Sequence, residues 1–230
     1  MSNGEAEIVA EKEGKFSCAV SPNPIGRLVI PSILGDVNVA RIAKHALLNC
    51  QEMTAVSIPS SVRTIGTCAF KNCNGLTTVT LPANVSSFGW AVFACCHELK
   101  QINVEVGNRF FASADGVLYT KDLTELVACP NGLTSVNISQ YVQNVGKCAF
   151  EGCDRLRSLS LPKGVVNIGK DAFLNCQGLA KVKMYGECPI VSNNVFRGCG
   201  NLKLIHVPTD CKSWAGMKEW QGIPLVFDAK

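Results

Sequence analysis

The stretch Ile58-Pro-Ser-Ser-Val-Arg-Thr-Ile-Gly-Thr-Cys-Ala-Phe-Lys-Asn-Cys-Asn-Gly-Leu76 recurs 23 residues later as Leu81-Pro-Ala-Asn-Val-Ser-Ser-Phe-Gly-Trp-Ala-Val-Phe-Ala-Cys-Cys-His-Glu-Leu99. Both copies carry Pro, Gly, Phe and Cys at the same positions. The frame returns at residues 138–156, 161–179 and, more loosely, 184–202. A fixed period of about 20–50 residues marks a solenoid, in which each unit buries its apolar side only against its neighbours. The sequence therefore predicts a β-rich stack of coils.

Each coil contains one alternating segment that ends at a proline. Val79 and Leu81 are expected to point inward, and Thr78 and Thr80 outward, as in a half-buried strand. Proline cannot donate to a strand ladder, so it ends the pairing there. The Ile-Gly and Ala-Phe pairs then form the second apolar side. Their phenylalanines are predicted to stack into one aromatic spine made of Phe70, Phe93, Phe150, Phe173 and Phe196.

The repeat is irregular at both ends and in the middle. We expect an N-terminal segment and cap at residues 1–27, a solenoid at 28–206 and a C-terminal cap at 207–230. The first coil carries a small insertion around Gly35-Asp36. An insertion at about 103–130 lengthens one interval, and its segments 117–119 and 126–128 predict a hairpin across a Lys121-Asp122 turn. In the tail, Trp214, Met217 and Trp220 have the spacing of one apolar helix face.

Composition limits the function classes. Apolar residues make up 47% and charged residues 17% of the 230 residues, which is enough apolar material for a continuous core. The net charge of +4 does not come with the clustered basic and aromatic residues of a nucleic-acid site. No apolar run approaches the roughly 18 residues that a membrane span needs. The acidic N-terminus lacks a signal-peptide pattern, so the protein is either cytoplasmic or begins after a removed export signal.

The 13 cysteines suggest a disulfide framework or a metal site at first sight. Side chains on neighbouring parallel coils are about 4.8 Å apart, whereas a bridge prefers about 3.8 Å between Cβ atoms. We therefore expect a ladder of free, packed thiols. Zinc needs a closed ligand set with closely spaced pairs, and this chain lacks one, so no metal or cofactor is predicted. The ladder consists of Cys50, Cys73, Cys96, Cys153, Cys176 and Cys199.

Catalysis finds no support in the sequence. His45, His97 and His206 are the only histidines, and none recurs beside a nucleophile. The outward strand positions are the better candidates for a functional site. They form two rows of hydroxyl and amide side chains that become basic at one end: Thr78, Thr80, Gln101, Asn103, Ser135, Asn137, Ser158, Ser160, Lys181, Lys183 and His206.

The repeat frame L-x-x-(I/V)-x-(I/L)-P-x-x-V-x-x-(I/F)-G-x-x-A-F-x-x-C resembles the BspA-like class of leucine-rich repeats, over about residues 28–220. Local departures are Leu47 in place of Phe, and Met184-Tyr185 in place of the apolar-Pro pair. The resemblance implies a right-handed coil stack with a parallel strand ladder. It also implies an exported or surface-displayed protein of the kind often implicated in adhesion to host or matrix proteins. The motif is structural and transfers no catalytic residue.

These observations predict a non-catalytic protein-binding module with a protein partner, either secreted or displayed on a cell surface. Two alternatives remain: a structural spacer within a larger surface protein, and an intracellular interaction scaffold. Within the binding hypothesis, a rival to the strand rows is the hairpin near residues 115–125, because binding residues often lie on loops held by a rigid scaffold. The oligomeric state is left open.

Overall fold

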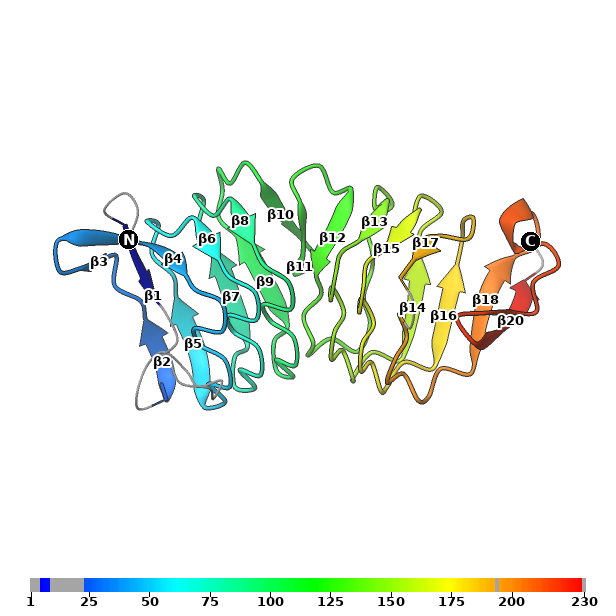
Figure 1. The fold of residues 1–230 in the computed structure, drawn as a ribbon, viewed down its shortest axis with the longest axis horizontal. Coiled ribbons are helices and arrows are strands. Elements are labelled where there is room, and N and C mark those ends of the chain that lie inside the picture. Colours follow the sequence, from blue (N-terminus) through cyan, green and yellow to red (C-terminus); the bar gives the residue numbers. More distant parts are fainter. Residues whose placement is uncertain (1–4, 9–22, 193–194, 229–230) are drawn as a thin grey trace.

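The computed structural model describes residues 5–8, 23–192 and 195–228. The chain forms an elongated β-solenoid whose coils follow one another from the N-terminus to the C-terminus (Figure 1). Within the described residues the only helix is one 3₁₀ turn, η1 (Lys212–Trp214). The predicted solenoid is therefore confirmed, and most coils contribute strands to two ladders.

The first ladder is formed by the segments that precede the prolines. All of its strands pair in parallel, as predicted, but in three separate groups. The groups are β2 (Gly26–Val29) with β5 (Met53–Ser57); β7 (Thr78–Leu81) with β9 (Gln101–Val104); and β14 (Ser158–Leu161), β16 (Lys181–Met184), β18 (Leu204–Pro208) and β20 (Ile223–Asp228).

The second ladder runs through the Ile-Gly positions and has two groups of short parallel strands. The first group comprises β1 (Glu5–Ile8), β4 (Val37–Ile42), β6 (Thr64–Ile65) and β8 (Ser87–Phe88), and the second β12 (Glu125–Ala128), β13 (Asn144–Val145), β15 (Asn167–Ile168) and β17 (Ile190–Val191). The small insertion at Gly35-Asp36 turns β3 (Ile33–Leu34) back onto β4.

The glycine of each Ile-Gly pair is explained by the distance between coils. A Cβ atom on Gly66 would lie 2.4 Å from the backbone nitrogen of Lys44, and one on Gly89 would lie 2.3 Å from that of Thr67. Any larger residue would push the coils apart. The close approach allows Gly89 N–H to donate to the Ile65 carbonyl at 2.8 Å.

The repeated cysteine also has a backbone partner. Cys73 Sγ donates to the Leu47 carbonyl at 3.1 Å, and Cys176 Sγ donates to the Phe150 carbonyl at 3.0 Å. The position therefore suits a small apolar residue with a weak donor. All described cysteines are unbridged, including the six of the ladder, while Cys18 lies outside the described residues.

The phenylalanines form two stacks, so the prediction of one spine is wrong. Phe70 stacks on Phe93 at 5.5 Å between ring centroids, and Phe173 stacks on Phe150 and Phe196 at 5.0 and 5.1 Å. The insertion occupies the position between the stacks. There, Cys129 N–H donates to the Ala149 carbonyl at 2.8 Å, as Phe150 N–H does to the Ala172 carbonyl, so Cys129 takes the position of a phenylalanine of the stack.

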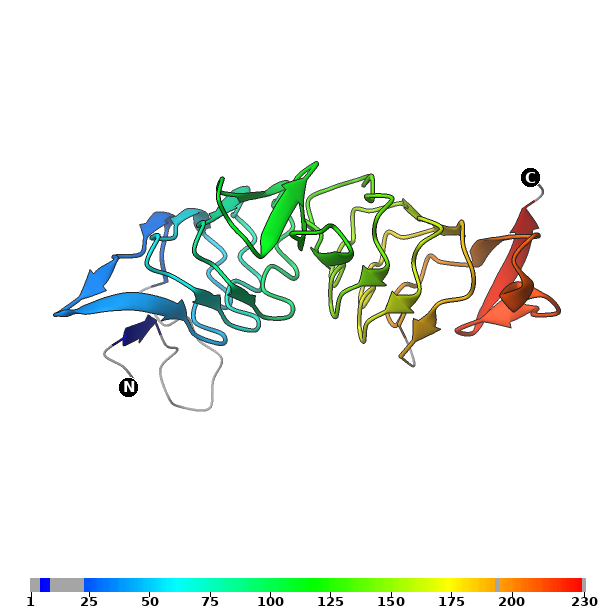
Figure 2. The same ribbon diagram turned by 90° about the horizontal axis from the view of Figure 1, so that it is seen from above.

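The insertion is a three-stranded meander, since β10 (Phe111–Ala114) and β11 (Val117–Thr120) pair antiparallel and β11 pairs with β12. The predicted hairpin is confirmed, and β10 extends it. Strand β11 lies between the two hydrophobic cores and contributes side chains to both. Val117 and Tyr119 pack into the C-terminal cluster, and Leu118 packs into the N-terminal cluster. Successive side chains of a strand point to opposite faces, which lets one strand serve both cores. Figure 2 shows the meander between the two groups of coils.

The tail does not form the predicted helix. Trp214 ends the 3₁₀ turn and Trp220 lies on β19 (Glu219–Trp220), which pairs with β20. Both tryptophans are buried, and Trp220 lies 5.8 Å from the Phe196 ring, whereas Met217 is exposed. The tail instead pairs β20 with the edge of β18. The backbone hydrogen bonds of this pairing stabilise an extended tail more than three residues at helical spacing stabilise a short helix.

Candidate binding surface

The outward rows of the first ladder lie in register, and we call them the strand face. Thr78 pairs with Gln101 and Thr80 with Asn103; Ser158 pairs with Lys181, and Ser160 with Lys183, which pairs with His206. Asn103, Lys183 and His206 are half-buried. The fully exposed members are Thr78, Thr80, Gln101, Ser158, Ser160 and Lys181.

Ser135 and Asn137 do not belong to a strand. The expectation that the outward rows continue without a break through these two residues is therefore wrong. Both are exposed, but residues 133–139 pair with neither β9 nor β14. The meander takes the place of the next rung: Ile102 N–H donates to the Gly116 carbonyl at 2.9 Å, and the Ser113 hydroxyl donates to the Ile102 carbonyl at 2.6 Å. The insertion therefore closes the edge of β9 and divides the strand face in two.

The basic end of the strand face is partly neutralised, which the sequence-based reasoning missed. Lys183 Nζ lies 2.9 Å from Asp228 Oδ2, and His206 Nδ1 lies 2.8 Å from Asp228 Oδ1. The hydrogen bond from His206, followed by that from Lys183, lowers the pKa of Asp228 to about 2. Of the predicted basic residues, only Lys181 forms no ion pair within the part of the chain that the structure describes. Asp228 lies beyond the repeat frame, in the segment predicted as the C-terminal cap, so no repeat position pointed to it.

A cleft of ≈ 360 Å³ opens at this end of the strand face, between the coils that carry β16 and β18. Its lining includes Lys163, Lys183, Tyr185 and Asp228. Lys183 lies over the Tyr185 ring at 5.1 Å from its centroid, so its ammonium group contacts both an aromatic face and a carboxylate. The cleft can accept an aromatic or polar side chain, with Lys163 on its lining as a cationic group for an anion.

The hairpin tip, the rival site, uses its carboxylate internally. Asp122 Oδ1 accepts hydrogen bonds from the hydroxyls of Thr120 and Thr124 at 2.7 and 2.9 Å. These bonds, that of Thr120 first, lower the pKa of Asp122. Asp122 therefore shapes the turn, and Lys121 is the exposed charge next to it, whereas the exposed Asp115 lies in the turn at the other end of β11.

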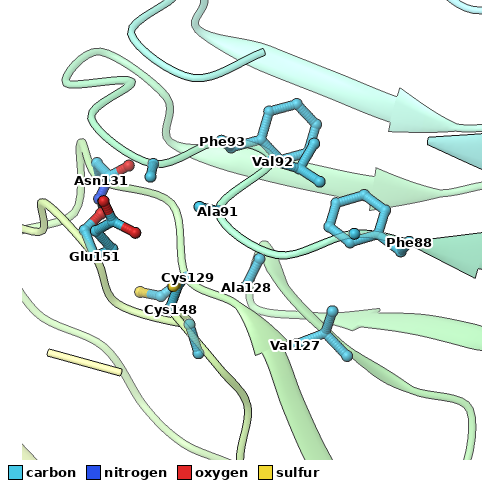
Figure 3. A pocket seen from close by; sticks show the side chains of 13 residues that line it. Phe88, Ala91, Val92, Phe93, Val127, Ala128, Cys129, Asn131, Cys148 and Glu151 are labelled. Atoms are coloured by element: carbon cyan, nitrogen blue, oxygen red, sulfur yellow. Dashed lines mark hydrogen bonds between the residues drawn. The ribbon is translucent and has the colours of Figure 1, made fainter. Parts of the chain in front are cut away.

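The junction between the two cores holds a small buried gap rather than a ligand pocket (Figure 3). Its volume is ≈ 10 Å³, about that of one water molecule. The Asn131 amide donates to the Glu151 carbonyl at 2.8 Å and accepts from Cys96 N–H at 3.2 Å. The buried Glu151 carboxylate pairs with Lys71 Nζ at 2.6 Å. Polar contacts thus replace the missing phenylalanine pair.

Metal binding and membrane crossing are two other possibilities for the described ranges. No group of three or more His, Cys, Asp or Glu side chains there could hold a metal ion. Nor does any helix in this part of the chain have the length and apolar character to cross a membrane. His97 and His206 each pair with an aspartate, Asp154 and Asp228 respectively.

The two ladders, the glycine-dependent contacts and the stacked aromatic residues define a leucine-rich-repeat solenoid. The sequence pattern of the BspA-type leucine-rich repeat region matches residues 29–130 and 125–216 with six copies. The chain belongs to this family.

Solved structures show the same fold. The chain is similar to the pneumococcal vaccine antigen PcpA, with a TM-score of 0.67, 21% identity and coverage of 89% of this chain and 57% of that one. It is also similar to a leucine-rich cell surface protein of Faecalibacterium prausnitzii, with a TM-score of 0.62, 21% identity and coverage of 89% and 59%. The chain thus spans less than two thirds of either protein. No curated protein matches it.

Proposed function

We propose that the chain is a non-catalytic module that binds a protein partner on its strand face, and that it acts as a secreted or surface-displayed adhesion or interaction protein. The family supports protein interaction in general, and the two similar structures are a vaccine antigen and a cell surface protein. Solenoids commonly bind partners on the extended surfaces that their repeats create.

The observation that carries this proposal is the chemistry of the strand face. Exposed hydroxyl and amide groups stand in register on β7 and β9, and again on β14 and β16. Short polar side chains of this kind lose little conformational entropy when a partner orders them. The cleft beside Lys183 and Tyr185 adds a concave position at one end, where a partner side chain can be buried.

The experiment is capture of host-cell and matrix proteins by the isolated chain, comparing wild type with Thr80→Trp and Ser160→Trp. Each substitution places a bulky side chain on one half of the strand face, and we expect faster dissociation from the captured partner. Ser87→Trp is the matched control, because Ser87 is exposed on β8 in the second ladder. Undiminished capture by both strand-face variants would contradict the proposal.

Two further variants separate the charge effect from the rival site. Lys181→Glu should reduce capture of an acidic partner and its dependence on salt, because exposed charges steer association. Lys121→Glu changes the same charge at the hairpin tip without disturbing strand β11. Loss of binding in this variant alone would move the site to the hairpin, and a chain that captures no partner would favour the spacer hypothesis.

A further inference from the structure

The second ladder carries a cleft that none of the preceding argument uses. It has a volume of ≈ 380 Å³ and is lined by residues of β12, β13, β15 and β17. Figure 1 shows these four strands in order from β12, the last strand of the meander, toward the C-terminus. The outward residues of these four strands form one row in register, which we call the cleft row. The cleft row consists of Glu125, Asn144, Asn167 and Ile190.

Glu125 is a half-buried carboxylate without a partner. Its side chain makes no hydrogen bond or ion pair with any described residue. Its Oε1 atom lies 3.0 Å from where a Cβ atom on Gly146 would be, so the missing side chain of Gly146 leaves the space that the carboxylate occupies. Burial, followed by the charge of Asp122, raises the pKa of Glu125. An unpaired carboxylate that has lost part of its hydration favours a cation beside it.

The lysine that lines the cleft is already engaged. Lys147 lines the cleft, but its Nζ atom lies over the Trp90 ring at 3.1 Å from the centroid. It does not form an ion pair with Glu125. The charge that complements Glu125 must therefore come from outside the described residues.

The middle of the cleft row offers one donor and one acceptor. Asn167 Nδ2 donates to Asn144 Oδ1 at 2.8 Å. This bond leaves Asn144 Nδ2 and Asn167 Oδ1 without partners. An amide donor next to an amide acceptor complements the C=O and N–H groups of an extended peptide backbone.

The far end of the cleft row is apolar. Ile190 is 76% exposed, although three of its neighbours in the row are polar or charged. The row spans three steps between strands, about 14 Å at about 4.8 Å per step. An extended peptide rises about 3.4 Å per residue and repeats its side-chain direction every second residue, so positions i and i+4 match this span.

We propose that the second-ladder cleft binds an extended segment of a partner protein that carries Lys or Arg at one position and an apolar residue four positions away. The cation pairs with Glu125, the peptide backbone bonds to Asn144 and Asn167, and the apolar side chain covers Ile190. This site is separate from the strand face, so the chain can hold two parts of one partner or two partners at once.

The test uses the full chain and the peptide acetyl-Arg-Thr-Ser-Thr-Leu-amide, with binding followed by amide NMR titration. We expect shifts at residues 125, 144, 167 and 190. Glu125→Gln should weaken binding about fivefold, the upper end for a surface ion pair, and added salt should weaken the wild type toward the same value. Glu219→Gln is the matched control, because it removes the same charge from an exposed residue on β19.

Two control peptides test the pattern itself. Acetyl-Glu-Thr-Ser-Thr-Leu-amide reverses the charge, and acetyl-Arg-Thr-Leu-Thr-Ser-amide halves the separation; both should bind more weakly. Equal binding by Glu125→Gln, equal binding of the reversed peptide, shifts confined to the strand face, or no shifts at millimolar peptide would each overturn the proposal. None of these results would bear on partner capture by the strand face.

Discussion

The coils before the meander and the coils after it follow the same repeat. The contacts between coils of one group differ from the contacts between the two groups. We call the core around residues 30–118 the N-terminal block and that around 117–220 the C-terminal block. Inside each block, identical side chains stack on one another, as Phe150, Phe173 and Phe196 do. Between the blocks, strand β11 packs apolar side chains into both cores, and the remaining side-chain contacts are polar and specific to single residues.

The junction illustrates what happens when a repeat loses its register. Lys71 pairs with Glu151, His97 with Asp154, and Trp90 with Lys147. A buried phenylalanine is worth several kcal/mol, whereas one hydrogen bond contributes about 1 kcal/mol net. The junction is therefore expected to be the weakest interface in the stack, and the blocks should be separable by mutation.

The largest effect is expected from removing residues 208–230. The deletion takes away Trp214 and Trp220, two buried residues that are each worth about 3–5 kcal/mol, and exposes the Phe196 end of the stack. We expect the C-terminal block to melt or aggregate while the N-terminal block stays folded. Thermal unfolding by circular dichroism with light scattering measures this. An unchanged melting temperature would show that the proposed cap is dispensable.

The two phenylalanine stacks can be compared directly. Phe70 and Phe173 are both fully buried, so each change to Ala should cost about 3–5 kcal/mol. Among the described residues Phe173 stacks on a ring on both sides and Phe70 on one side, so Phe173→Ala should cost about 0.5–1.5 kcal/mol more. Urea unfolding gives both values. A larger loss for Phe70→Ala would refute the role assigned to stacking.

The junction itself is tested by Asn131→Ala. The change leaves the Glu151 carbonyl without this donor, while Cys96 N–H keeps its bond to the Phe93 carbonyl at 3.3 Å, so the cost should be about 1–3 kcal/mol. The blocks should then unfold in separate steps, with a smaller denaturant slope for each. Asn84→Ala is the control, because its exposed amide makes one bond to the Ser60 carbonyl. A single cooperative transition in Asn131→Ala would contradict the weak-junction interpretation.

The smallest expected effect is a pH dependence of stability, and it concerns the C-terminal block alone. The pKa of Asp228 is lowered to about 2 by His206 and Lys183, below its value of about 4 in an unfolded chain. A depressed pKa contributes stability above pH ~4, which is lost as the pH falls through about 2. Melting temperatures between pH 5 and 2 should fall less in Asp228→Asn than in wild type. Asp36→Asn, in the exposed turn between β3 and β4, should keep the wild-type profile.

Much of the candidate surface could be predicted from the period alone. The register of Thr78 with Gln101 and of Ser160 with Lys183 follows because each residue meets its counterpart 23 positions away. The break at Ser135 and Asn137 could not be predicted, because it depends on Gly116 and Ser113 taking over the edge of β9. Asp228 was missed for a similar reason, since β20 pairs outside the repeat frame.

The amino-acid sequence by itself determined the coil, the inward and outward positions of its strands and the free cysteine ladder. These features depend on nearest-neighbour contacts that a fixed period encodes in every repeat. Only the tertiary structure decided where the stack divides, what replaces the missing phenylalanine and which charges remain free. Lys71 and Glu151 are 80 residues apart, and such contacts depend on how an irregular insertion folds between regular coils.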